Sequence, residues 1–282
     1  MAVRIIADST CDLSQELIEQ YGITILPLYV TLNGKDHRDG WDITSADIFK
    51  AVDAGSDLPK TAAVTAADWM RAIEWLRGEA PDDEILLITI SEKFSSCYQN
   101  AVIAAREFSH VYAVDSRNLS TGFGHVVLAA AEYAEQGMGA EEIVGKLADL
   151  IPRVDASFIV DRLDYLYKGG RCSAVAAFGA NLLRLKPCIA VIDGEMRVIR
   201  KYRGSFVQCV TQYTKERLAD MSQVVPHRIF ITHPAAPEEA VRAAEQAIRA
   251  CGDFTYITET HAGCTVSSHC GPHTLGVLFI RK

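Results

Sequence analysis

Short apolar runs alternate with segments of helical periodicity along the first half of the chain. Residues 3–7, 85–90 and 111–114 are almost wholly apolar, which is typical of strands buried on both faces of a sheet. Residues 23–32 form an extended segment that Pro27 interrupts, and Asn33-Gly34 favours a hairpin turn after it. Helices are expected at 13–21, 42–54, 66–77, 96–106, 123–135 and 140–151. The alternation predicts a mostly parallel, three-layer α/β domain with helices on both faces of its sheet.

The second half mixes strands and helices less regularly. Strands are expected at 156–160, 228–233, 254–258 and 276–280, and a hairpin at 188–199 turns at Asp193-Gly194. Helices are expected at 162–168, 174–185, 205–219 and 237–251, and a polar loop precedes the last strand. We therefore predict two domains, an N-terminal α/β domain at 1–153 and a C-terminal α+β domain at 154–282.

Polar loops follow three of the predicted strands, at 8–12, 91–96 and 115–122. The carboxyl ends of parallel strands meet at one edge of a sheet, and open α/β sheets bind ligands at that edge. Ser91, Ser95 and Ser96 precede a predicted helix, where free N–H groups and hydroxyls suit a carboxylate or a phosphate. The alternative is that Ser95 only caps this helix.

Composition and charge narrow the classes of partner. The 282 residues carry 28 lysines and arginines and 36 acidic residues, a formal net charge of −8, which argues against nucleic acid or an anionic membrane as the main partner. No apolar run is long enough to span a membrane, and the sequence enters a strand directly rather than a signal peptide. Because the eight cysteines form no Cys-x-x-Cys pair, we expect reduced thiols and a cytoplasmic protein.

Two clusters of functional side chains lie in the second half. Lys168-Gly169-Gly170-Arg171 is either part of an anion site or a glycine stop flanked by solvated charges. His269, Cys270 and His273 invite a metal ion, but their spacing matches no zinc pattern, so we expect no metal and no cofactor.

Motifs of several enzyme classes are absent. The chain has no Gly-x-Ser-x-Gly elbow, and no G-x-G-x-x-G follows the first strand. An anion site made of hydroxyls and a helix N-terminus remains, with Arg171 and His269 as candidate cationic partners. The apolar surroundings favour a carboxylate head with an apolar tail over a free phosphate.

The chain resembles the DegV family of bacterial fatty-acid-binding proteins over nearly its entire length. The longest matches are residues 8–13 (D-S-T-x-D-L), 90–101 (I-S-S-x-L-S-G-T-Y-Q-S-A), 163–173 (L-x-Y-L-x-K-G-G-R-I-S) and 269–272 (H-x-G-P). Shorter matches follow in family order at 27–30, 115–116, 182–187, 193–194 and 203–204. The sequence departs from the family at two loops, where 61–65 (T-A-A-V-T) replaces T-S-Q-P-S and 95–97 (S-S-C) replaces S-G-T. It also departs at Glu92, which replaces the second serine of I-S-S, and at His273, which replaces the glycine after G-P.

The resemblance implies a two-domain DegV-like fold that holds one long-chain fatty acid in a buried apolar tunnel. Carried over by motif, Thr61 and Ser95 hold the carboxylate and His269 lies close to it. Ser91, Ser96 and Arg171 complete the candidate ligand set, while Lys168 and Arg203 belong to the head-group region or to a docking face.

Related members of this family are the binding subunits of a bacterial fatty acid kinase. They present the carboxyl group to a separate catalytic subunit, which forms an acyl phosphate. The resemblance therefore implies a carrier without catalytic groups of its own, with a fatty acid and a kinase as partners and with transient membrane contact allowed.

An enzyme is the alternative. In that hypothesis the protein hydrolyses a small acid derivative or ester, with Ser95 or Cys97 as nucleophile and His269 as base. A cysteine pKa lowered at the helix start would favour Cys97.

Overall fold

The computed structural model describes residues 2–161, 163–171 and 185–282. The helix expected at 174–185 falls almost wholly outside the described residues, as does the end of the motif at 163–173. Within the described ranges, no helix is both long enough and apolar enough to cross a bilayer.

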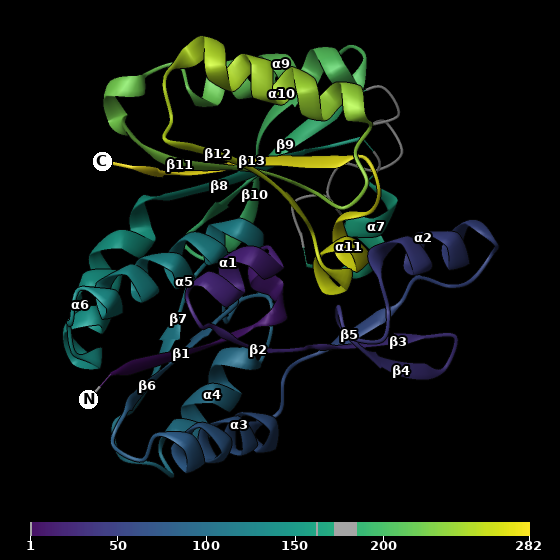
Figure 1. Ribbon diagram of the computed structural model, residues 1–282. Coiled ribbons are helices and arrows are strands. Elements are labelled where there is room, and N and C mark those ends of the chain that lie inside the picture. The colour runs from purple at the N-terminus through teal and green to yellow at the C-terminus, as the bar shows by residue number, and fades with distance from the viewer. Residues whose placement is uncertain (1, 162, 172–184) are drawn as a thin grey trace.

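A four-stranded parallel sheet forms one half of the body, with the strand order β2-β1-β6-β7. Its strands are β1 (Val3–Asp8), β2 (Thr24–Leu26), β6 (Glu84–Thr89) and β7 (Val111–Asp115). One face is covered by α3 (Ala66–Glu79) and α4 (Cys97–Ala105), and the other by α1 (Gln15–Gln20), α5 (Ser120–Glu135) and α6 (Ala140–Leu150) (Figure 1). The predicted parallel sheet with helices on both faces is confirmed.

A six-stranded mixed sheet forms the other half, in the order β10-β9-β8-β13-β11-β12. Its strands are β8 (Val154–Val160), β9 (Lys186–Ile192), β10 (Glu195–Tyr202), β11 (Val224–His233), β12 (Tyr256–His261) and β13 (Thr274–Arg281). Helices α9 (Phe206–Arg217) and α10 (Glu238–Cys251) cover its outer face (Figure 1). The predicted boundary lies where the chain leaves the 3₁₀ turn η2 (Ile151–Arg153) and enters β8.

Helix α5 packs between the two sheets and joins the halves into one body. Every residue from Ser120 to Ala131 is buried, which is the pattern of a helix enclosed on all sides. Two glycines allow this close packing. A Cβ on Gly122 would lie 2.7 Å from Ala156 Cβ in β8, and one on Gly124 would lie 2.8 Å from the Cys11 carbonyl oxygen, near the end of β1.

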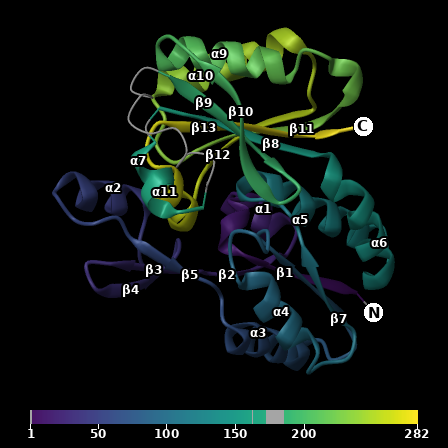
Figure 2. The same cartoon turned by 180° about the vertical axis from the view of Figure 1, so that it is seen from behind.

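A smaller antiparallel sheet lies beside the body, in the order β4-β3-β5 (Figure 1 and Figure 2). It consists of β3 (Tyr29–Leu32), β4 (Lys35–Arg38) and β5 (Lys60–Ala62), and it packs with α2 (Ser45–Asp53) and α7 (Asp164–Gly169). Asn33 and Gly34 have φ of 53° and 76°, as the predicted hairpin turn requires. Reading 59–65 as a plain connector was wrong, because pairing with β3 makes 60–62 a strand.

The polar segment before the last strand contains helix α11 (Cys264–Cys270), so the prediction of a loop there was wrong. Serine, threonine and cysteine have weak helix propensity, and tertiary contacts fix this helix instead. The N–H groups of Cys264 and Thr265 donate to the buried Asp39 carboxylate at 2.7 and 3.1 Å, and Gly263 N–H donates to Asp12 at 2.8 Å. Carboxylates are favoured at a helix N-terminus, so residues near the start of the chain determine where this helix forms.

Replacing Asp39 tests this anchoring. In Asp39→Ala the two N–H groups lose their acceptor, and we expect the free energy of unfolding to fall by about 3 kcal/mol. The measurement is urea unfolding followed by circular dichroism. Asp53→Ala, at an exposed position in α2, is the matched control and should change stability by no more than about 0.5 kcal/mol. Equal stability of the two variants would contradict the anchoring role.

Candidate functional site

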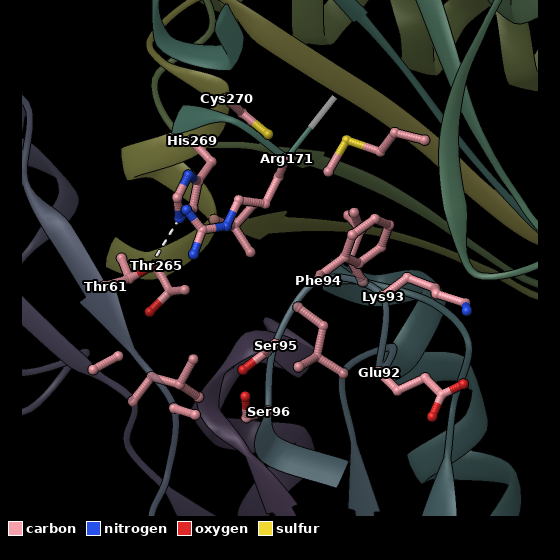
Figure 3. Close-up of a pocket in the computed structure, with 17 residues that line it drawn as sticks. Thr61, Glu92, Lys93, Phe94, Ser95, Ser96, Arg171, Thr265, His269 and Cys270 are labelled. Carbon is pink, nitrogen blue, oxygen red and sulfur yellow. Dashed lines mark hydrogen bonds between the residues drawn. The ribbon is translucent and has the colours of Figure 1, made fainter. Parts of the chain in front are cut away.

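A cavity of about 400 Å³ opens where the three sheets come together (Figure 3). Its volume lies in the range of small-molecule sites. The walls come from β5, the loop after β6, α11 and the end of the β9–β10 hairpin. The lining side chains include Leu28, 61–63, Ile90, 92–96, Leu119, Arg171, Met196, Thr265, Val266, His269 and Cys270.

Thr61, His269 and Arg171 point toward one another on one side of the cavity, with Ser95 and Ser96 on the facing loop (Figure 3). Thr61 Oγ1 and His269 Nε2 form a hydrogen bond of 2.9 Å. Pairing of Thr61 with Val30 fixes the strand that carries this hydroxyl. The arrangement gathers hydroxyls, a ring nitrogen and a guanidinium. These are groups that can donate hydrogen bonds to a carboxylate.

His269 is held in a neutral state by its surroundings. Burial lowers its pKa to about 4, and the positive charge of Arg171 adds to the effect. Its ring packs against Gly169, where an added Cβ would lie 2.6 Å from Nδ1. Gly170 ends α7 in the left-handed conformation, with φ of 68°. The two glycines of the Lys-Gly-Gly-Arg motif therefore serve different needs, one for close packing and one for a helix end.

The three candidate serines occupy different environments. Ser96 is exposed at the N-cap of α4, and its side chain forms no capping hydrogen bond. Ser95 is half-buried, and its hydroxyl accepts a hydrogen bond of 3.3 Å from the Cys97 N–H. Ser91 is fully buried outside the cavity lining, and its hydroxyl donates to the Gly194 carbonyl at 2.9 Å. Ser95 and Ser96 thus face the cavity, while Ser91 holds the β9–β10 hairpin against the loop.

The remaining predicted residues lie outside the cavity. Lys168 is exposed in the last turn of α7, and Arg203 is exposed between β10 and α9. His273, which the sequence grouped with His269, lies 3.6 Å from Asp161 and stacks on Phe206.

The geometry gives no support to a nucleophile at the start of α4. Cys97 is fully buried, and burial raises its pKa, with the Asp8 charge adding to the effect. The condition that would favour Cys97 as a nucleophile, a lowered thiol pKa, is therefore not met, because desolvation outweighs the helix dipole. The hydrogen bond of His269 Nε2 goes to Thr61 rather than to Ser95, so the described residues form no serine–histidine pair.

Thr265 was missed by the sequence reasoning. It lies one turn before His269 in α11 and lines the cavity, and its Oγ1 is buried without a hydrogen-bond partner among the described residues. Thr265 and His269 have the i, i+4 spacing that places two side chains on the same face of a helix. This spacing could have indicated Thr265 as a site residue, but only if the segment had been predicted to be helical.

The segment 8–12 connects the cavity walls. Asp8 accepts the Ile90 N–H at 2.8 Å, in the loop after β6. Ser9 accepts the Leu28 N–H at 3.1 Å and donates to Asp39, and Asp12 accepts the Gly263 N–H. Segment 8–12 therefore holds the loop after β6, which carries Ser95 and Ser96, in a fixed arrangement with the connection at Leu28 and with α11.

The apolar side of the cavity continues toward the interior. A small cavity of about 20 Å³ lies between α11, the start of α5 and the six-stranded sheet, and Leu119, Val266 and Cys270 line both spaces. Phe158 and Leu278 lie farther along its wall. The polar groups therefore occupy one side of the main cavity, and the small apolar cavity adjoins it at the start of α5.

The comparisons with known proteins agree on one family. Residues 2–282 match the family model described as "Uncharacterised protein, DegV family". A DegV domain-containing protein of Caldanaerobacter subterraneus subsp. tengcongensis is 33% identical over 284 residues, which cover 99% of each chain. A fatty acid-binding protein of Thermotoga maritima is 29% identical, covering 98% of this chain and 96% of the relative.

Solved structures agree as well. A DegV family protein from Thermus thermophilus, described for its fatty acid binding, superposes with a TM-score of 0.93 at 32% identity over the whole of both chains. With the family model, the relatives and the fold in agreement, this chain belongs to the DegV family.

Proposed function

We propose that this protein binds one long-chain fatty acid and presents its carboxyl group to a separate kinase. The observation that carries the proposal is the cavity with Thr61, Ser95, Arg171 and His269 on its polar side and a small apolar cavity adjoining it at the start of α5. The fatty acid binding described for the Thermus and Thermotoga relatives supports the same ligand class.

The tail supplies most of the affinity in this proposal. Burial contributes about 0.8 kcal/mol per CH₂ group, so a sixteen-carbon chain gains about 10 kcal/mol before the cost of ordering it. The available volume between α11, the start of α5 and the six-stranded sheet is small, so the tail enters by moving side chains such as Leu119 and Val266 apart.

The head group is fixed by the polar side. Arg171 supplies the positive charge that balances a carboxylate, while the hydroxyls of Thr61, Ser95 and Thr265 donate hydrogen bonds to its oxygens. Because His269 is neutral, its main part is to orient Thr61 through their shared hydrogen bond.

The carboxyl end lies toward the surface, which suits transfer to a partner. Ser96 and Arg171 are exposed at this end of the cavity. Lys168 and Arg203 are exposed cations outside the lining, and we assign them to the kinase-docking face. The kinase would supply the phosphoryl group, and this chain would position the acceptor oxygen.

Native mass spectrometry of the purified protein tests the ligand directly. We expect a mass increase equal to one fatty acid per chain, and organic extraction followed by a second mass measurement identifies the acyl group. A protein that is empty and takes up no added palmitate would overturn the proposal.

Removing the Thr61 hydroxyl tests the head-group assignment. Thr61→Val keeps the side-chain shape and the strand, and we expect about tenfold weaker palmitate binding in a fluorescent fatty acid displacement assay. Thr31→Val, on the adjacent strand β3, is the control and should bind as the wild type does. Unchanged affinity in Thr61→Val would remove Thr61 from the site.

The two glycines after Lys168 provide a matched pair. Gly169→Ala pushes a methyl group against His269, so we expect weaker palmitate binding. Gly170→Ala meets no atom within 4 Å but strains a left-handed residue, so it should lower stability by about 1 kcal/mol and leave binding intact. The displacement assay and thermal unfolding separate the two effects, and equal binding losses would contradict this assignment.

A further inference from the structure

A second cavity, of about 280 Å³, shares no lining residue with the first. It lies among the loop before α5, η2, the β9–β10 hairpin, α9 and β13. Four arginines line it, namely Arg117, Arg153, Arg217 and Arg281, together with Asp155 and Asp193. We refer to it as the arginine cavity.

The arginine cavity carries an excess of positive charge. Four guanidinium groups face two carboxylates, 4 − 2 = +2, in a chain whose formal net charge is −8. Arg217 and Arg281 both pair with Asp155, whose side chain is 4% exposed, and Arg281 Nε lies 2.6 Å from its Oδ2. One carboxylate neutralises only one of these two arginines, so the buried side of the cavity stays cationic.

The other two arginines are free to take a ligand. Arg117 lies 3.7 Å from Asp193, but both side chains are exposed, at 48% and 72%, so the pair is weak. Arg153 is exposed and makes no ion pair with a described residue. Arg217 also lines the cavity, and its Nε is buried without a hydrogen-bond partner among the described residues.

The backbone at Arg117 is unusual. Its φ of 51° is in the left-handed region, which disfavours a residue with a Cβ. A hydrogen bond of 2.8 Å from Arg117 N–H to Asp115 holds the loop in this conformation. Strain of this kind persists where the surrounding structure enforces it, and it is concentrated at functional positions.

An apolar wall completes the arginine cavity. Ile192 and Ile199 of the β9–β10 hairpin line it and are 37% and 39% exposed, which is high for isoleucine. A ligand that covers these two side chains while meeting the arginines has an anionic head and a small apolar group. Guanidinium groups bind phosphate oxygens in a bidentate manner, and the charge of +2 matches a phosphate dianion.

We propose that the arginine cavity binds a phosphate monoester that carries a small apolar substituent. Arg117 and Arg153 close over the phosphate, Arg217 contributes positive charge from the more buried side, and Ile192 and Ile199 contact the substituent. The site is separate from the fatty acid cavity and does not depend on the function proposed for it.

Phenyl phosphate and inorganic phosphate are the probes for a free ligand, measured by isothermal titration calorimetry. We expect saturable phenyl phosphate binding with a dissociation constant of about 1 mM or tighter, given the size of the probe. Inorganic phosphate should bind more weakly, and Ile192→Ser/Ile199→Ser should abolish the difference. Co-flotation with phosphatidylcholine vesicles, with and without phosphatidic acid, tests a lipid headgroup as the source of the same chemistry.

The decisive variant is Arg117→Ala/Arg153→Ala, because both side chains are exposed and neither forms an ion pair with Asp155. We expect at least about tenfold weaker phenyl phosphate binding, or loss of co-flotation. Arg242→Ala/Arg249→Ala on α10 removes the same charge from exposed pairs with Glu238 and Glu245 and should bind as the wild type does.

Each titration is repeated after saturation with palmitate, which controls for probe entry into the first cavity. Binding of either probe that the decisive variant loses, and that palmitate does not displace, supports the site. Three outcomes overturn the proposal. They are binding of neither probe, equal binding by Arg117→Ala/Arg153→Ala and Arg242→Ala/Arg249→Ala, and displacement of the probe by palmitate.

Discussion

Burial of carboxylates beneath the cavity is the constraint on which the site depends. Asp8, Asp12 and Asp39 are almost fully enclosed, and burial raises the pKa of Asp8 to about 6 and that of Asp12 to about 8. Polar groups buried in such a place are costly unless they form hydrogen bonds. Here the role of these side chains is geometric, since their oxygens accept N–H groups from the loop after β6 and from the start of α11.

Close backbone contact is the second requirement. Helix α5 contacts β8 of the six-stranded sheet at Gly122 and the segment after β1 at Gly124, and the His269 ring packs directly on Gly169. In each case a single methyl group would occupy space already taken by another atom. The fold therefore places glycine where two elements must approach closely, and the cavity keeps its shape because these contacts leave little freedom to adjust.

Regular elements with a strong pattern could be predicted from the sequence, and the site only in part. The strands β1, β6 and β7 and the turns at Asn33-Gly34 and Asp193-Gly194 follow from local sequence alone, although β7 is a half-buried edge strand rather than one buried on both faces. Helix α11 could not be predicted in this way, because it is held by Asp39, which is distant in the sequence. Strand β5 could not be predicted either, because it depends on pairing with β3, which is also distant in the sequence. For the same reason Thr265 was overlooked, and the buried position of Ser91 was not expected.

The order in which the site's parts occur along the chain has a consequence for biosynthesis. Thr61 and His269 are 208 positions apart, and α11 precedes only β13 in the chain. A nascent chain emerges from its N-terminus, so β5 is exposed to solvent long before α11 is available to complete the polar side of the cavity. The fatty acid proposed for this cavity would therefore stabilise only chains that are almost fully synthesised.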